Sequence, residues 1–435
     1  MSISKDDRVD LQPDDIPTKW YNIAADLPEP LPPPLNPATN KPLRPEDLEA
    51  IFPKGAIAQE LSVERYIDIP EEVRDAYLML GRPSPLQRAR RLEKYLKTPA
   101  KIYFKREDLS PAGSHKPNSA IPQAYLNMKE GVENLTTETG AGQWGSALAL
   151  SCAHFDLNCE VFMVRSSYDQ KPFRRLVMET YGATVHASPS NVTKYGRSVI
   201  AKQPEHPGTL GIAITEAVEV CLQQENTKYS LGSVLNHVML HQTVIGQEVM
   251  MQLEQIDTVP DYMVGCVGGG SNFAGFCFPM IGEKIKGKID TEFIATESVS
   301  APSLTEGELR YDFGDTGKMT PKLKMYTMGC DYVPPAIHAG GLRYHGMAPA
   351  VSKVAELGYM KTYAYDQNDT FAAGIAFAQN EGIIPAPESC HAIKGAMDLA
   401  LEAKKNNEEK VIVFNLSGHG LLDMAGYDRY LRNNL

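Results

Sequence analysis

Lys116 has the sequence surroundings of a nucleophilic lysine. It lies in GSHKPNSA (113–120), directly before a predicted helix whose first position suits Pro117. The positive end of the helix dipole disfavours the ammonium form, so the pKa of Lys116 should fall and favour a neutral amine that can bond to a carbonyl carbon. Position alone leaves a second interpretation open, because most lysines are solvated surface residues.

The segment GGGSN (268–272) could hold a phosphate group. It follows the apolar run DYMVGCV (261–267), and its glycines would let backbone amides approach an anion at the start of the next helix. A dinucleotide fingerprint would need a third glycine where Phe273 stands. The pattern therefore suits a single phosphate and argues against a nucleotide-dependent oxidoreductase. A plain tight turn explains it about equally well.

The segment ETGAGQWG (138–145) could hold a carboxylate. Glu138 ends a predicted strand, and the glycine-rich loop after it opens a helix whose free amides would bind an anion. The Glu138 carboxyl at the rim could then transfer protons. The alternative is a glycine-rich connection with an exposed acid.

Two further side chains stand at positions where a ligand would meet them. Ser417 in LSGHG (416–420) follows an apolar strand, and Glu388 in EGIIPAPESCHA (381–392) stands near a helix start. A turn or a helix cap is the simpler explanation for each of them.

The elements that would position these residues alternate between strand and helix. Strands are expected at 101–107, 132–138, 159–164, 183–188, 261–267, 292–298 and 410–417, and helices at 117–130, from Trp144 and through 173–182. Pro122 is expected to bend the first of these helices. This alternation predicts an α/β architecture with parallel sheets. Ligands bind beyond the carboxyl ends of such strands, where the motifs stand.

Bulk composition narrows the class of protein. A chain of 435 residues is expected to form two domains. Its net charge of −11 argues against nucleic acid or an anionic membrane as partner. The seven cysteines form no C-x-x-C pair, which indicates free thiols in a reducing compartment. With no apolar leader and no run long enough to span a membrane, a cytoplasmic location is expected.

The first 80 residues form an unusual lead-in. LPEPLPPPLNP (27–37) is proline-rich and should be extended. A structural arm that wraps a surface is the simpler interpretation, and a subunit contact is the alternative.

Taken in order, the motifs resemble those of the tryptophan synthase β chain, a fold-type II pyridoxal-phosphate enzyme. The matching pieces run from GRPSPL (81–86) to LSGHG, most of the chain, and they are GRPSPL, KREDL, GSHKPN, ETGAGQWG, GGGSN, EGIIPAPES and LSGHG. The long lead-in, SHKPN and GGLRYHG are similar to the second, longer type of β chain. The resemblance implies two three-layer α/β/α domains with the cofactor, pyridoxal 5′-phosphate, between them.

The resemblance also implies roles for single residues. Lys116 would bind the cofactor covalently and then move the α-proton of the substrate, and Glu138 would act as acid and base near the leaving group and the indole nitrogen. Glu388 would lie close to the cofactor ring, and Ser417 would meet its pyridine nitrogen. The cofactor would be held by His115, Lys116, Asn118, Gly268, Gly269, Gly270, Ser271 and Asn272, and the substrate by Thr139, Gly140, Ala141, Gly142, Gln143, Trp144 and Arg343.

The expected reaction joins indole to L-serine to give L-tryptophan and water. A neutral hydroxyl such as that of Ser417 does not keep the pyridine nitrogen protonated as a carboxylate would. The electron sink is therefore weaker, which favours loss of a β-substituent over transamination.

Two positions depart from the commoner β chains. Trp144 stands where those chains usually carry His, and Arg343 in HAGGLRYHG (338–346) stands where they carry an acid that handles the serine hydroxyl. An arginine near the leaving group would suit an anionic one, so O-phosphoserine is a candidate donor beside or instead of serine. A structural ion pair is an equally good explanation for Arg343.

Two other classes of function are less consistent with these residues. A related lyase such as threonine synthase or a serine/threonine dehydratase has no need of an acid that faces indole, and a non-catalytic subunit would not need both Lys116 and Glu138.

The resemblance further implies a homodimer, leaves room for a monovalent cation without identifying its ligands, and leaves the binding of a tryptophan synthase α chain open. The expected domains are an arm and the start of the smaller domain at 1–80, a larger cofactor domain at 81–114 and 233–435, and a smaller domain with a mobile segment at 115–232.

Overall fold

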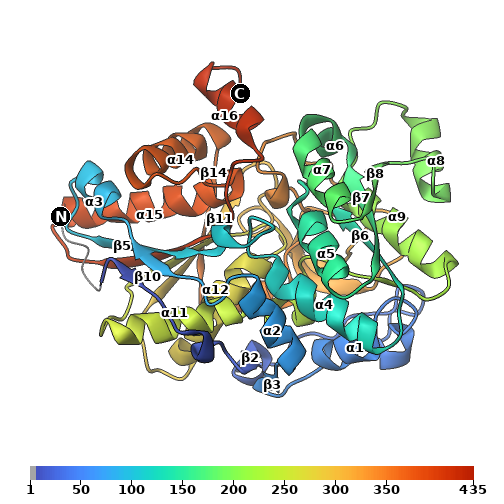
Figure 1. Cartoon of the computed structure of the whole chain (residues 1–435), viewed down its shortest axis with the longest axis horizontal. Helices are drawn as coiled ribbons and strands as arrows, with labels where there is room; N and C mark the ends of the chain where they lie inside the picture. Colours follow the sequence, from blue (N-terminus) through green and yellow to red (C-terminus); the bar gives the residue numbers. More distant parts are fainter. Residues whose placement is uncertain (1–5) are drawn as a thin grey trace.

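Two separate sheets of mainly parallel strands organise the molecule (Figure 1). The computed structural model describes residues 6–435. The larger sheet has the order β1-β4-β5-β15-β10-β11-β14, and its strands from β5 to β14 run parallel, while β1 and β4 are antiparallel at one edge. These strands are β1 (Arg8–Val9), β4 (Leu86–Arg88), β5 (Lys101–Arg106), β10 (Tyr262–Cys266), β11 (Glu292–Ser298), β14 (Lys361–Tyr365) and β15 (Val411–Leu416).

The smaller sheet has four parallel strands in the order β8-β7-β6-β9. They are β6 (Asn134–Thr139), β7 (Asn158–Val164), β8 (Thr184–Ser188) and β9 (Thr227–Tyr229). Two antiparallel pairs stand apart from both sheets: β2 (Lys19–Tyr21) with β3 (Tyr66–Asp68), and β12 (Glu308–Phe313) with β13 (Lys322–Thr327).

Helices cover both faces of each sheet. In Figure 1 helices α14 (Gln367–Glu381) and α15 (Pro387–Asn406) lie above the larger sheet, and α11 (Val244–Gln255) and α12 (Ser271–Ile285) lie below it. On the smaller sheet α5 (Gln143–His154) packs between the strands and its neighbours α4 (Pro117–Lys129) and α7 (Pro172–Thr180), whereas α9 (Leu210–Gln223) covers the other side. The remaining α-helices of the described residues are α1 (Lys54–Glu60), α2 (Glu71–Met79), α3 (Arg90–Leu96), α6 (Arg165–Gln170), α8 (Lys194–Lys202), α10 (Asn236–Gln242), α13 (Pro349–Glu356) and α16 (Met424–Leu431), and short 3-10 helices lie at Pro13–Asp15, Ile23–Ala25, Pro45–Asp47, Glu107–Leu109 and Gly340–Leu342.

Each strand and helix predicted from the alternating pattern is present, with ends that differ by two residues or fewer. The central strands are apolar on both faces because helices cover both, as in β15, where every residue from Ile412 to Leu416 is buried. Helix α4 continues through Pro122. Proline removes the N–H that would pair with the carbonyl of Asn118, and the Tyr77 hydroxyl donates to that carbonyl instead, at 2.5 Å.

The proline-rich segment 27–37 contains no helix, and it has bends at Pro28 and Glu29 and a turn at Pro37. Leu35 pairs with Lys322 of β13, and the Tyr311 hydroxyl donates to the Pro33 carbonyl at 3.1 Å. The segment therefore packs along its own chain, which favours the structural-arm interpretation.

The shortest strands of the two sheets were not predicted from the sequence. β9 has three residues and the antiparallel edge strands β1 and β4 have two and three, too few to show a periodic pattern. β9 matters for the site, because its last residue, Tyr229, lies in the wall of the main cavity.

Candidate active site

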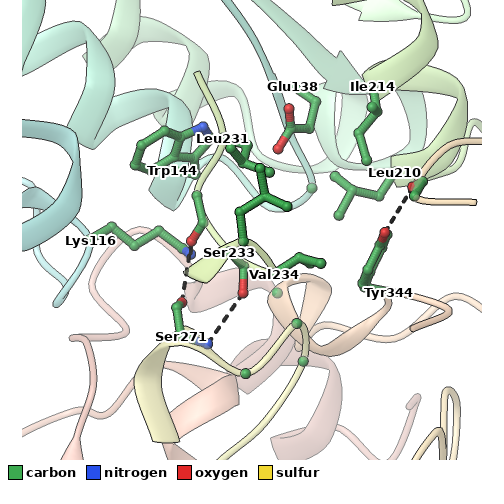
Figure 2. A pocket seen from close by; sticks show the side chains of 18 of the residues that line it. Lys116, Glu138, Trp144, Leu210, Ile214, Leu231, Ser233, Val234, Ser271 and Tyr344 are labelled. Carbon is green, nitrogen blue, oxygen red and sulfur yellow. Dashed lines mark hydrogen bonds between the residues drawn. The ribbon is translucent and has the colours of Figure 1, made fainter. Parts of the chain in front are cut away.

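One cavity lies where the carboxyl ends of strands from both sheets meet. β6 leads into the loop after Glu138, β10 into the glycines at 268–270 and β15 into Ser417. Lys116 enters the cavity from the residue before α4 (Figure 2). The predicted site residues that line this cavity are His115, Lys116, Glu138, Thr139, Gly140, Ala141, Gln143, Trp144, Gly268, Gly269, Gly270, Ser271, Asn272, Glu388 and Ser417.

The amine of Lys116 is prepared to act as a nucleophile. Its Nζ donates a hydrogen bond to the Gly232 carbonyl at 3.0 Å. Burial lowers the pKa of Lys116 to about 8, while the nearby Glu138 and Glu388 oppose this shift. The direction expected from the sequence is therefore present, and its main cause is burial in the cavity wall. Near neutral pH an appreciable fraction of this amine is neutral.

Glu138 is a buried carboxyl with a strongly shifted pKa. Burial raises the pKa of Glu138 to about 7, and the hydrogen bond from Tyr229 and the charge of Lys116 only partly offset this rise. The Tyr229 hydroxyl donates to Oε2 at 2.5 Å. A carboxyl that titrates near neutral pH can both give and take a proton, which is what an acid and base in one reaction cycle must do.

The glycine loop after β10 forms a cradle for a small anion. Gly270 has φ +106° and precedes α12, so that the free amides of the first turn point outward. A Cβ on Gly268 would collide with the Gly341 carbonyl, and one on Gly269 would stand 2.5 Å from Ser233 Oγ. Ser233 also accepts the Ser271 amide at 3.2 Å (Figure 2). Amides at a helix N-terminus beside a hydroxyl fit a phosphate.

Three buried polar atoms in the wall have no hydrogen-bond partner among the described residues: His115 Nε2 and Glu388 Oε2 beside the glycine loop, and His237 Nε2 beside the lead-in. The other carboxylate oxygen of Glu388 accepts the Gly341 amide at 2.8 Å. Burial lowers the pKa of His115 to about 3, so that its ring is neutral. Unpartnered atoms of this kind usually mark the place of a polar group. The donor set and the spare acceptors therefore fit a flat, phosphate-bearing ring that reaches from the glycine loop to Glu388.

Ser417 lies at the far end of the same wall. Its Oγ is 2.7 Å from Ser389 Oγ and 3.6 Å from Cys266 Sγ. Burial raises the pKa of Cys266 to about 12, so the thiol is neutral. The two groups nearest to Ser417 Oγ, the Ser389 hydroxyl and the Cys266 thiol, are neutral, which agrees with the sequence argument for a weaker electron sink.

The loop Thr139–Gln143 presents the first-turn amides of α5 to the cavity. Gly142 takes φ +101° directly before the helix, and a Cβ there would stand 2.7 Å from the Arg174 side chain. The Thr139 hydroxyl accepts the Gly145 amide at 3.1 Å and secures the turn. The arrangement suits a carboxylate.

Trp144 shapes the space around Lys116. Its ring nitrogen donates to Thr137 Oγ1 at 2.6 Å, and its ring centroid is 6.0 Å from Lys116 Nζ. A Cβ on Gly232 would stand 2.5 Å from this ring, so only glycine permits the approach.

The cavity continues into an apolar chamber that the sequence analysis missed. Its walls come from the N-terminal lead-in, from α9 and from β9 and the turn after it: Pro34, Leu43, Leu48, Ile51, Phe52, Ala56, Ile57, Leu210, Ile214, Tyr229 and Leu231. No motif marks these residues, because each belongs to an ordinary apolar pattern. Ser233 and Tyr229 could have been found from the rule that strand ends carry ligands, had β9 been recognised.

Three predicted site residues are not part of the cavity wall. Asn118 lies beneath it, where its side chain bonds to Arg82 and Glu107. Gly142 packs on Arg174 behind the loop. Arg343 points away, and its Nη2 donates to the Pro334 carbonyl at 2.9 Å. In the described part of the chain no carboxylate is within ion-pair distance of Arg343, so the structural ion pair considered for it is not formed.

Other features of the chain bear less directly on the site. All seven cysteines are free thiols, as predicted. Among residues 6–435 no helix is long and apolar enough to cross a membrane. The same residues contain no cluster of three or more metal-binding side chains.

Comparison with known proteins gives consistent results. Residues 77–418 match the family model described as "Pyridoxal-phosphate dependent enzyme". The chain is 58% identical to "Tryptophan synthase beta chain 2" of Methanosarcina acetivorans over 98% of this chain and 97% of that one. It is 57% identical to the protein of the same name in Aquifex aeolicus, over 97% and 98% of the two chains.

Similar solved structures share the fold at low sequence identity. A fungal L-serine ammonia-lyase from Rhizomucor miehei aligns with a TM-score of 0.59 at 16% identity, over 81% of this chain and 98% of that one. A threonine deaminase, its source given as "T.th.", aligns with a TM-score of 0.56 at 15% identity, over 80% and 97% of the two chains. Likeness at this level establishes the architecture alone.

Proposed function

The chain belongs to the pyridoxal-phosphate-dependent enzyme family, among the tryptophan synthase β chains, and from this we propose that it joins indole to L-serine to give L-tryptophan and water. One observation carries the proposal. The amine of Lys116, the carboxyl of Glu138, both anion-binding loops and an apolar chamber share a single cavity. A reaction between a small polar amino acid and an apolar aromatic ring needs this combination.

The residues divide the chemistry between them. The glycine loop, Glu388 and Ser417 would hold pyridoxal phosphate, which when bound would supply the electron sink that makes the α-proton of the amino acid acidic. Lys116 anchors the cofactor and takes and returns that proton. The loop 139–143 orients the substrate carboxylate. Glu138 gives a proton to the departing hydroxyl and takes one from the indole nitrogen, and the apolar chamber excludes water from the reacting atoms.

A simpler lyase that removes water or ammonia from serine is the second candidate, because similar solved structures carry such names. Such an enzyme has one amino-acid substrate and needs neither a large apolar chamber nor a carboxyl beside it. Glu138 and the chamber therefore favour the reaction with indole.

Arg343 supports a finer proposal about the amino-acid donor. Its guanidinium is mostly buried without a carboxylate partner among the described residues, and burial lowers the pKa of Arg343. Its neighbours Leu342 and Tyr344 line the cavity, so the backbone of Arg343 runs along the cavity wall. We propose that O-phosphoserine serves as donor beside or instead of serine, with release of phosphate. Turnover of serine and of O-phosphoserine is compared in the parent chain and in Arg343→Ala. No gain with O-phosphoserine in the parent chain, together with no selective loss of that donor in Arg343→Ala, would contradict the proposal.

Further properties are proposed from the composition and the resemblance. The enzyme is a cytoplasmic homodimer, and residues 115–232 form a smaller domain that includes a mobile segment over the site. A monovalent cation assists it. An α chain is a candidate partner, which co-purification with that chain tests directly.

The main experiment follows the absorption of the bound cofactor. Purified protein is mixed with pyridoxal phosphate, then with L-serine, then with indole, beside Lys116→Ala. We expect a cofactor band that changes with serine, tryptophan on addition of indole, and loss of both responses in the variant. Release of ammonia without any tryptophan would support the simpler lyase, and no cofactor band would overturn the proposal.

A further inference from the structure

The Glu138 carboxyl is held by a phenol from a different part of the chain. Tyr229 lies 91 residues later in sequence, and its hydroxyl donates to Glu138 Oε2 at 2.5 Å. Both side chains are buried, with exposed fractions of 2% for Tyr229 and 6% for Glu138. In the described residues no side chain donates to Oε1 of Glu138. Backbone amides of Glu138 and Gly232 also act on this carboxyl, so Tyr229 is its one side-chain donor among the described residues.

Tyr229 is in turn fixed by residues 49–52 of the N-terminal lead-in. The Tyr229 amide donates to the Ile51 carbonyl at 2.9 Å, and the rings of Tyr229 and Phe52 are 5.9 Å apart. Next to it, Lys228 Nζ donates to the carbonyl of Glu49. The lead-in thus holds Tyr229 by a backbone hydrogen bond and a ring contact, and its neighbour Lys228 by a charged hydrogen bond.

The titratable groups around this pair come from three other segments. Lys116, before α4, faces Glu138, while Tyr344, after β13, and Asp315, after β12, face Tyr229. Tyr344 donates its own hydroxyl to the Gly314 carbonyl at 2.8 Å and takes no part in the contact with Glu138. Tyr229 is thus the side chain that holds Glu138 in place.

We propose that Tyr229 is a positioning residue for Glu138, through which the N-terminal lead-in orients the acid that serves the indole reaction. The inference rests on the proposed function for the role of Glu138, but the contact itself is independent of it. By holding Oε2, Tyr229 directs Oε1 toward the cavity. The hydroxyl donates to the charged carboxylate and so stabilises it, which keeps part of Glu138 ionised at neutral pH.

The test measures the protonation of Glu138 directly. The carboxyl stretch of Glu138 is followed by difference infrared spectroscopy of the holoenzyme between pH 5 and 9, and is identified by its loss in Glu138→Gln. In the parent chain it should titrate near pH 7, in line with the burial described above. In Tyr229→Phe the midpoint should rise by about one pH unit, since a hydrogen bond to a charged group is lost.

Tyr344→Phe is the matched control, because it removes a second buried hydroxyl from the same cavity wall without touching Glu138. Its midpoint should stay at the parent value. An unchanged midpoint in Tyr229→Phe, or an equal shift in both variants, overturns the proposal. Because the infrared measurement needs no turnover, it gives its answer even if the reaction with indole is not found.

A second variant covers the case in which Tyr229→Phe does not fold. Incorporation of 3-fluorotyrosine at position 229 keeps the shape and makes the phenol a stronger donor. The midpoint of Glu138 should then move below the parent value, and a move upward or no move contradicts the proposal. In the synthesis assay Tyr229→Phe should lower kcat and leave the KM for serine unchanged.

Discussion

The ammonium of Lys171 lies 2.6 Å from the carboxylate of Asp423, so a buried ion pair joins the start of α7 to the segment after β15. Arg174 adds a second contact to the same carboxylate at 2.9 Å and packs against Gly142 in the carboxylate-binding loop. Asp423 thus holds helix α7, which supports this loop, although Asp423 is far from both the helix and the loop in sequence.

Replacement Asp423→Asn should lower the free energy of unfolding by about 3 to 5 kcal/mol, because two buried cations lose their counter-charge. Burial alone would raise the pKa of Asp423, but Lys171 and Arg174 outweigh it and the pKa is lowered. This stabilisation is therefore present above about pH 4 and is lost as the pH falls through the lowered pKa. Denaturant unfolding at pH 7 and pH 3 measures it. A difference between parent and variant that is as large at pH 3 as at pH 7 contradicts the assignment.

The capture of pyridoxal phosphate by the apoprotein should accelerate as the pH rises and level off above about pH 8, where Lys116 becomes neutral. Stopped-flow absorbance at each pH gives the midpoint. Glu138→Gln is a useful second variant, since its lost negative charge should move the midpoint of Lys116 to lower pH. A midpoint near 10, as for an ordinary lysine, would show that the amine is not buried as described.

Replacement Gly268→Ala should reduce the affinity for pyridoxal phosphate by at least about tenfold, because the new Cβ would collide with the Gly341 backbone and displace the cradle. Gly265→Ala is the control, since Gly265 lies outside the cavity wall and the new Cβ would approach nothing closer than the Phe273 side chain at 3.2 Å. Fluorescence titration of the two apoproteins compares them. Similar affinities would mean that the glycine loop does not hold the phosphate.

Replacement Ile214→Ala should raise the KM for indole by about tenfold and leave the KM for serine nearly unchanged, because it removes apolar surface from the chamber only. Leu222→Ala on the same helix is the control, since this side chain is 51% exposed and lies outside the cavity. Steady-state assays with each substrate varied give the answer. A parallel rise of both KM values would place the indole elsewhere.

Much of the site was predictable because its parts are local patterns. The glycines at 268–270 and the loop after Glu138 each combine a strand with a glycine-rich turn, and Lys116 stands before Pro117 at the start of a helix. Parallel strands bring such turns to one edge of a sheet, so their convergence on one cavity follows from the α/β pattern. The resemblance of the ordered motifs then indicated the family.

Side-chain direction was not predictable from motif membership. Asn118 and Arg343 stand next to residues that line the cavity, yet one points into a buried network with Glu107 and the other toward Pro334. A one-residue step along a chain turns the side chain to another face, and only packing decides which face meets the ligand.

The sequence by itself therefore determined the fold class, the glycine-rich turns and the place of Lys116 at a helix start, because glycine freedom and apolar periodicity act over a few residues. The tertiary structure alone decided which distant groups meet: Tyr229 with Glu138 across 91 residues, Lys171 with Asp423 across 252, and the N-terminal lead-in with the apolar chamber. Such contacts depend on how whole layers pack, and no local pattern carries that information.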